Sequence, residues 1–544
     1  MRCKIALMFN FLGKLYFQKK LQKNLQKKHE NKEQYSKNYE TLKQFVLSRN
    51  VENNITRLKE TMNNSFDIED RYFKIAGTNI KAAILYIDNL IDENIVMEHV
   101  LKPLIIESAF VRNIVAEGVI DFQNITDYML SIGNVREVQS FDEIVLGIMS
   151  GDTFLCIEGY TKGLLITARE YQGRTIGEPS VEPSTGGPQE AFVEILKKNI
   201  GLIRRRLRDP DLSIEMYKIG RRSKSDVAIL YINGIVDQDI VKEVRNRIQS
   251  LDIDGPVTTV QVGELISDRP NSIFPLFQST ERPDKIVSAL SEARVAILMD
   301  GSPEAIIVPV TLPILMQASD DYFQNWIIAS IIRISRYFAF FISTILPAMY
   351  ISTTSFHPGM LPTTLALSIA VTRAGVPFPA VVEAIIMEFV LELLQEASIR
   401  LPKVIGETVS IVGGLVIGQA AVQAGIVSPI MVIVIAFTAV SSFVLPSYSL
   451  CLATRVVRIP FMILAVTFGS FGISIGLLWL LTYLCSLKSF GIRYMQPITP
   501  YRIRDWKDTI IRTPIRSHSK RPEFLNPEDT QRQNLKKGRN SNEN

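Results

Sequence analysis

The stretch Pro379–Pro402, PAVVEAIIMEFVLELLQEASIRLP, decides the fold of this chain. It is apolar and long enough to form a membrane-spanning helix, yet it carries four glutamates, Glu383, Glu388, Glu392 and Glu396. An ionised acid at the centre of a bilayer costs roughly 2.5–3.5 kcal/mol, so leaving all four in lipid would cost on the order of 10 kcal/mol. We therefore expect these carboxylates to face other protein, water or an ion path, or to be neutral.

The glutamates divide between two faces of the expected helix. At 100° per residue, one stripe about 100° wide holds four polar residues, which are Glu388, Glu392, Gln395 and Glu396. Glu383 lies on the opposite side. If the stripe lined a hydrated path, its acids would attract cations and repel anions. The three acids of the stripe are therefore our candidates for an ion path.

A structural interpretation of the same acids is also open. The carboxylates could pair with Arg373, Arg400 or Arg455, or form hydrogen bonds between subunits. The secondary polar candidates of the apolar region are Glu383, Gln395, Glu407, Gln419 and Gln423. The residues alone do not choose between a path and a helix contact.

Long apolar runs dominate the rest of the C-terminal half, and each can cross about 30 Å of hydrocarbon. Besides the Glu-bearing stretch they are Tyr337–Ser355, Val409–Val427, Ile430–Leu450 and Ile459–Leu487. The sequence therefore predicts five spans. A shorter apolar piece, Leu361–Val371, is bracketed by Pro and Gly and could be a re-entrant or interfacial segment or a sixth span.

Basic residues flank the spans and predict their direction. Placing Arg and Lys inside makes the first span run from inside to outside, and the Glu-bearing span run back. Five crossings would then leave the basic tail, with Lys488, Arg493 and Arg502, on the outside. A sixth crossing would bring the tail inside, and the sequence does not decide between the two.

Charge and composition narrow the class of protein. Residues 1–60 carry 14 Lys and Arg against 5 Asp and Glu, and residues 486–544 carry 13 against 6. Basic ends of this kind bind nucleic acid or an anionic membrane surface, and the apolar spans favour the membrane. We therefore expect contact with membrane lipids and no nucleic-acid partner.

No pattern predicts an active site, a metal centre or a cofactor. The four Cys have no paired spacing and the four His lie far apart, which argues against a disulfide framework, a zinc site and a His-ligated metal. The sequence also lacks a nucleophile motif and a Walker-type loop. We therefore expect a protein that is not an enzyme and that binds no cofactor.

The N-terminal half contains an internal duplication. Ala82–Val100 aligns without gaps on Val227–Arg245, and Ser140–Gly159 resembles Pro283–Gly301 in its order of strand, acid and glycine. Each copy alternates buried strands with helices, which predicts a small α/β layer. The expected fold is a duplicated α/β region followed by an all-α membrane domain of five to six helices.

These patterns divide the chain into five parts. They are a basic, Lys-rich arm at 1–66, a first α/β subdomain with linker and helix at 67–205, a second subdomain at 206–318, a transmembrane domain at 319–487 and a basic, disordered tail at 488–544. Three consecutive arginines, Arg204–Arg206, end the helix that follows the linker. They could contact acidic partners or phosphates, or only complement the C-terminus of the helix.

Several long stretches are typical of one known family. They include GGPQEAFVEILKKNIGLIRRRLRDPDL at 186–212, TSFHPGMLPTTLALSIA at 354–370 and ETVSIVGGLVIGQAAVQAGIVSPIMVIV at 407–434. The Glu-bearing stretch fits the family pattern EA..ME...EL..EA.IRLP at its four glutamates. From about Asp67 to Pro500 the chain resembles the A subunit of the GerA-type spore germinant receptors of endospore-forming bacteria.

The resemblance implies a protein of the spore inner membrane with a cytoplasmic N-terminal region. It implies two partners, a transporter-like B subunit that is the expected germinant binder and a lipoprotein C subunit. It also implies a homo-oligomer that forms a channel and releases monovalent cations at the start of germination. The alternatives are a secondary transporter component, against which no inverted repeat is evident in the spans, and a scaffold subunit without a pore.

Overall fold

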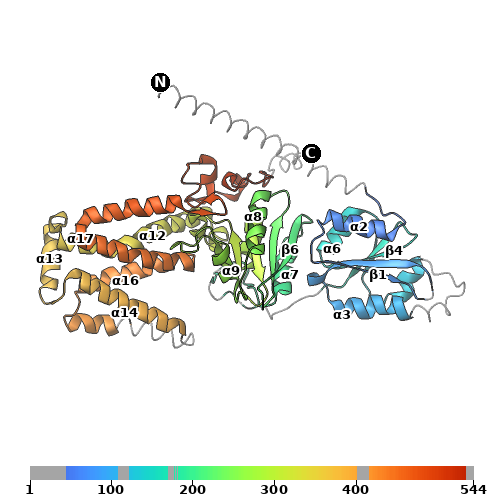
Figure 1. The fold of residues 1–544 in the computed structure, drawn as a ribbon, viewed down its shortest axis with the longest axis horizontal. Coiled ribbons are helices and arrows are strands. Elements are labelled where there is room, and N and C mark those ends of the chain that lie inside the picture. The colour runs from blue at the N-terminus through green and yellow to red at the C-terminus, as the bar shows by residue number, and fades with distance from the viewer. Residues whose placement is uncertain are drawn as a thin grey trace, which may run out of the picture. The chain divides into compact units, whose positions relative to one another are not determined.

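The computed structural model describes residues 45–533, apart from residue 77, residues 108–121, residues 170–176, positions 178, 180, 181 and 185, residues 401–413 and residue 415 (Figure 1). The chain forms two compact units. The α/β unit comprises the chain up to Ser267, residues Ser279–Pro309 and the chain from His518 on. The helical unit comprises Asp268–Gln278 and Val310–Ser517.

The first sheet of the α/β unit has five strands in the order β1-β2-β4-β5-β3, all paired antiparallel. The strands are β1 (Ile68–Lys74), β2 (Lys81–Ile87), β3 (Val135–Val138), β4 (Asp152–Ile157) and β5 (Gly163–Thr167). Ala83 of β2 lies in a core formed with α2 (Val51–Thr61) and α6 (Phe141–Met149). Its neighbour Ile84 lies in a second core on the opposite face, because side chains alternate along a strand.

Short helical elements cover that opposite face of the first sheet. They are α3 (Glu93–Val96), α5 (Phe122–Asn124) and the wider turns η2 (Met97–Leu101), η3 (Pro103–Glu107) and η4 (Ile125–Met129). Because both faces of the sheet are covered, every residue of β4 is buried.

The second sheet has the order β6-β7-β9-β10-β8, which is the order of the first sheet with each strand replaced by its counterpart. Its strands are β6 (Leu212–Ile219), β7 (Ser225–Ile232), β8 (Gln278–Thr280), β9 (Val295–Met299) and β10 (Ala305–Val308). Its helices are α7 (Leu196–Arg206), α8 (Gln238–Gln249), α9 (Thr259–Ile266) and α10 (Pro283–Ser291). The segments that align in sequence occupy corresponding places, since Ala82–Val100 contributes β2 and Val227–Arg245 contributes β7.

The two sheets are joined by a buried ion pair at the end of α7. Arg204 is 1% exposed, and its Nε and Nη2 donate to the two carboxylate oxygens of Asp67 at 2.8 and 3.0 Å. Nη2 also donates to the Ser65 hydroxyl and to the Leu212 carbonyl, both at 2.9 Å. The two following arginines pair with Glu190. All three arginines therefore form ion pairs with acids of the same chain, in addition to complementing the C-terminus of α7.

The helical unit contains apolar helices that follow one another in the sequence. They are α11 (Leu312–Leu315), α12 (Trp326–Ser355), α13 (Thr363–Arg373), α14 (Ala380–Arg400), α16 (Pro429–Phe443) and α17 (Tyr448–Ser486). Among the described residues, α12 and α17 are long and apolar enough to cross a membrane. The Glu-bearing stretch forms α14, and the short apolar piece before it forms α13. Of the expected span Val409–Val427, residues 416–423 are helical, and residues 401–413 and 415 lie outside the described part.

The last two expected spans have different boundaries in the structure. The helix expected at Ile430–Leu450 already ends at Phe443, because Pro446 interrupts it and Ser447 caps the next helix by accepting a hydrogen bond from the Leu450 amide. The prediction of one span at Ile459–Leu487 is also wrong, because the chain reverses its direction inside α17.

The reversal lies at Gly469, whose φ of 60° and ψ of −138° are open to glycine and strained for other residues. The two halves of α17 fold back on each other as an antiparallel pair (Figure 1). A Cβ built on Gly472 would lie 2.0 Å from the carbonyl oxygen of Leu464, and one on Gly476 would lie 2.9 Å from the ring of Phe461. In a straight helix these residues would be about 12 and 22 Å apart. α17 is therefore a helical hairpin.

The C-terminal tail is more ordered than the sequence suggested. We expected a disordered tail from residue 488, but β11 (Lys488–Ser489) and β12 (Ile492–Arg493) pair as a hairpin, followed by short 3-10 turns η7 (Ile503–Asp508), η8 (Ile515–Ser517) and η9 (Glu523–Leu525). In the α/β unit, Arg521 donates to the Ser291 carbonyl at 2.9 Å and pairs with Asp529 at 2.6 Å. The Ser291 carbonyl is distant from Arg521 in sequence, so the local composition of the tail does not reveal this contact.

Candidate functional site

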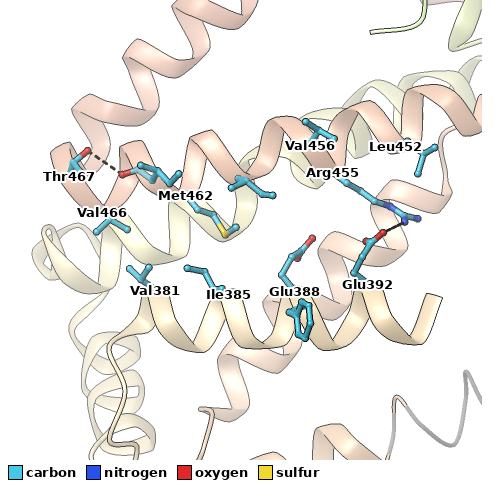
Figure 2. Close-up of a pocket in the computed structure, with 13 residues that line it drawn as sticks. Val381, Ile385, Glu388, Glu392, Leu452, Arg455, Val456, Met462, Val466 and Thr467 are labelled. Atoms are coloured by element: carbon cyan, nitrogen blue, oxygen red, sulfur yellow. Dashed lines mark hydrogen bonds and ion pairs between the residues drawn. The ribbon is translucent and has the colours of Figure 1, made fainter. Parts of the chain in front are cut away.

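Glu388 and Glu392 of the acidic stripe line a groove between α14 and the first half of α17, and Glu396 is not among its lining residues (Figure 2). The groove has a volume of about 780 Å³ and is lined mainly by aliphatic side chains of the two helices. Its charged lining residues are Glu388, Glu392 and Arg455. A carboxylate on such a wall attracts a cation where water enters the groove.

Glu388 is the most enclosed acid of the stripe. It pairs with Arg458 of α17, which is 1% exposed, while the Glu388 side chain is 14% exposed. Arg458 is in turn held by α12, because its Nε donates to the Ser343 carbonyl at 2.8 Å. Glu388 Oε2 and Arg458 Nη2 are buried and, within the described part of the chain, have no hydrogen-bond partner. The pair is therefore buried but incompletely satisfied.

The other two acids of the stripe are more exposed. Glu392 lies 3.4 Å from Nη1 of Arg455 and is half-exposed. Glu396 pairs with Arg400 one turn further along α14, and both side chains are exposed. Exposed pairs of this kind contribute about 0–1 kcal/mol. Three glutamates and three arginines thus balance one another along the stripe in this structure.

Glu383 points away from the groove and has a different environment. It is fully buried and accepts hydrogen bonds from the amide and hydroxyl of Ser428, both at 2.8 Å, and from Nε of Arg373 at 3.3 Å. Ser428 immediately precedes α16, so the carboxylate lies at the positive end of that helix. Glu383 therefore joins α13, α14 and the start of α16.

The secondary polar candidates lie at several places. Gln395 is half-buried on α14, and Gln419 and Gln423 are exposed on the helical segment 416–423. Glu407 lies outside the described residues. The three described glutamines are not among the residues that line the groove.

Sequence reasoning missed two partners of the acids, Arg458 and Ser428. In the sequence Arg458 is one of the basic residues that flank a span. Its spacing offered a usable signal, since Arg455 and Arg458 are three apart and Glu388 and Glu392 are four apart, so each pair lies on one helix face. An acidic pair on one helix and a basic pair on the facing helix can therefore form ion pairs with each other.

Comparisons with known proteins agree with one another. The chain is 39% identical over 489 residues to spore germination protein KA of Bacillus subtilis (strain 168), covering 90% of this chain and 89% of that protein. It is 40% identical over 487 residues to spore germination protein B1 of the same organism, covering 90% and 99%. It is 37% identical over 476 residues to the uncharacterized membrane protein YfkQ of that organism, covering 88% and 91%.

Similarity to a solved structure covers part of the chain. That structure is the crystal structure of the N-terminal domain of the A subunit of the Bacillus megaterium spore germinant receptor GerK3, with 31% identity and a TM-score of 0.39, covering 48% of this chain and 96% of that one. The family model described as Bacillus/Clostridium GerA spore germination protein matches residues 56–524. The resemblance found in the sequence is confirmed, and the chain belongs to the GerA spore germination protein family.

Proposed function

We propose that this chain is a subunit of a nutrient germinant receptor in the spore inner membrane, and that it converts germinant binding by a partner into release of monovalent cations. The ion path runs beside α14 in a homo-oligomer. The observation that carries the proposal is the placement of Glu388 and Glu392 on the wall of an apolar groove in a protein of the spore germination family. No catalytic step is part of the proposal.

The proposed partners are a transporter-like B subunit that binds the germinant and a lipoprotein C subunit. The α/β unit, which we place in the cytoplasm, presents two sheets of the same strand order. We propose that these are the duplicated subdomains, and that they serve as assembly surfaces for partners or for neighbouring copies of the chain.

We further propose six membrane crossings with both ends of the helical unit on one side. The crossings are α12, α14, the apolar sequence run Val409–Val427, α16 and the two halves of α17. At 11 residues and about 16 Å, α13 is too short to cross. Arg333 near the start of α12 pairs with Asp508 of the tail at 2.7 Å, which supports a common side for these segments. This count removes the conflict over the basic tail.

Cysteine labelling in membrane vesicles tests this topology. With the native cysteines replaced, Lys224→Cys in the α/β unit and Tyr501→Cys in the tail should react with a membrane-impermeant maleimide from the same side. Gly359→Cys, in the exposed turn between α12 and α13, should react from the other side. Labelling of positions 224 and 501 from opposite sides would mean an odd number of crossings.

Ion flux tests the path itself. Liposomes that contain the purified chain should pass K⁺ or Na⁺, and Glu388→Gln combined with Glu392→Gln should reduce that flux by roughly tenfold, because a loss of about 1.4 kcal/mol of cation stabilisation is a factor of ten. Glu137→Gln, an exposed acid of the α/β unit, is the control and should leave flux unchanged.

The other functions give different results in the same liposomes. Unchanged flux in the double variant would remove the two glutamates from the path. Uptake of radiolabelled germinant without ion current would indicate a secondary transporter component. A chain that passes neither ions nor germinant would be a scaffold subunit.

A further inference from the structure

The helical unit includes a loop that lies, in sequence, within the second α/β subdomain. This anchor loop, Asp268–Gln278, lies in sequence between α9 and β8. Asp268 Oδ2 accepts from the Phe490 amide at 2.6 Å, and the Leu276 carbonyl accepts from the Ser489 hydroxyl at 2.7 Å. The Ile273 amide donates to the Tyr483 hydroxyl at 3.2 Å. Hydrogen bonds at several points along the loop therefore fix it to the end of α17 and the segment after it.

The centre of the anchor loop is Phe274, which is 1% exposed. Its ring centroid lies 6.5 Å from Phe340 of α12, 6.2 Å from Tyr483 of α17 and 6.5 Å from Tyr494. Contacts of this kind fix the relative positions of aromatic side chains, because tilted rings interlock and leave little free volume. A displacement of the loop must therefore displace α12, α17 or both.

The contacts continue from Phe274 to the acidic stripe. Phe340 is followed one turn later by Ser343, whose hydroxyl donates back to the Phe340 carbonyl at 3.0 Å. The Ser343 carbonyl accepts the Nε proton of Arg458, and Arg458 pairs with Glu388. Each step is a direct contact, and every residue in it is buried except Glu388, which is 14% exposed. The anchor loop and the stripe are therefore connected by an unbroken network.

The ion pair at the end of this network is suited to change state. Its two atoms without partners in the described chain, Glu388 Oε2 and Arg458 Nη2, would gain hydrogen bonds if water entered the groove. While the pair is closed, the arginine neutralises the acid that would otherwise attract a cation. A small shift of Ser343 would withdraw one of the two groups that hold Arg458 in place.

We propose that the Glu388–Arg458 pair is the closed gate of the path beside α14, and that the anchor loop controls this gate through Phe274, Phe340 and Ser343. The proposal rests on the ion path proposed above. Movement of the α/β unit, whose strand β8 continues directly from the loop, shifts α12 and releases Arg458 from Ser343. Glu388 then becomes free to interact with water and cations.

The experiment measures hydration of the groove and ion flux separately, on the full chain in liposomes. Met462 lines the groove and is buried, so Met462→Cys in a background without other cysteines should react slowly with a small charged thiol reagent. Adding Phe274→Ala should speed this reaction and increase K⁺ flux, each by roughly tenfold, which is a typical size for coupling between two sites. Phe338→Ala on an exposed face of α12 is the control and should change neither rate.

The same Phe274→Ala change in a background that carries Glu388→Gln and Arg458→Gln tests the route. If the gate is the ion pair, Phe274→Ala should have no further effect there. An equal effect in both backgrounds, or no effect on labelling in the natural background, overturns the proposal. If Phe274→Ala fails to fold, Tyr483→Phe replaces it, because it removes only the hydroxyl that binds Ser272 and Ile273.

The two readouts separate this proposal from the proposed function. Faster labelling that depends on the pair, without K⁺ flux in any variant, would support the relay and contradict the ion path. Flux that falls in the glutamate double variant but does not respond to Phe274→Ala or Tyr483→Phe would support the ion path and contradict the relay.

Discussion

Replacing Arg204 by methionine should lower the free energy of unfolding of the α/β unit by about 3–5 kcal/mol, because it leaves Asp67 buried without its partner. Both side chains of this pair are 1% exposed. Pulse proteolysis of the full chain in urea measures the effect, since it reports the unfolded fraction without requiring an isolated fragment. The variant should become protease-sensitive at a clearly lower urea concentration than the natural chain.

Arg205→Met is the matched control for this prediction. Arg205 lies on the same helix, is exposed and pairs with Glu190 at the surface, so its loss should cost less than about 1 kcal/mol. Changing Asp67 to Asn in the Arg204→Met chain should recover part of the loss, because the buried charge is then absent. Equal urea midpoints for Arg204→Met and Arg205→Met would show that the buried pair does not hold the unit together.

The position of Arg204 explains why a large effect is expected. It lies at the end of α7, which packs on the second sheet, and it binds Asp67 just before β1 of the first sheet. Lys197 of α7 also reaches Asp88 at 2.5 Å, and the Phe66 amide donates to the Ile214 carbonyl at 3.3 Å. Arg204 is therefore central to a set of contacts that make two similar subdomains into one unit.

The sequence predicts those features of the fold that depend on local patterns. Repeated strand and helix segments led to two α/β layers, and the structure confirms two antiparallel sheets. The apolar stretch with regular glutamates led to a helix, and α14 covers Ala380–Arg400. In each case the signal is a periodic one that neighbouring residues reinforce.

Features that depend on contacts between distant residues were not predicted. The reversal at Gly469 lies within residues 461–487, an apolar run without Pro or charge, and only its closeness to Phe356 and His357 in the folded chain shows how it is packed. In the sequence Arg458 is only a basic residue that flanks a span. Its contacts with α14 and α12 become known only from the folded chain. Tertiary partners decide both cases, and a local pattern does not contain them.

Gly472→Ala should prevent the α17 hairpin from forming as it does in this structure. The added methyl carbon would lie 2.0 Å from the carbonyl oxygen and 2.7 Å from the carbonyl carbon of Leu464. These are backbone atoms of the facing helix, so the clash can be relieved only by separating the two halves of α17. Overpacking typically costs about 1–3 kcal/mol, and a backbone clash of this size should lie at or above the upper end.

The measurement is thermal unfolding of the full chain in detergent, combined with the yield of monodisperse protein. Gly359→Ala is the control, because a Cβ at Gly359 meets nothing within 4 Å and should leave both quantities unchanged. A disulfide between Phe461→Cys and Gly476→Cys should form readily in the natural chain and poorly with Gly472→Ala. If Gly472→Ala keeps natural stability and cross-linking, the halves of α17 do not pack closely at this glycine. If the disulfide fails to form in the natural chain as well, α17 is straight and the number of crossings is odd, so the tail and the start of α12 could not share one side of the membrane.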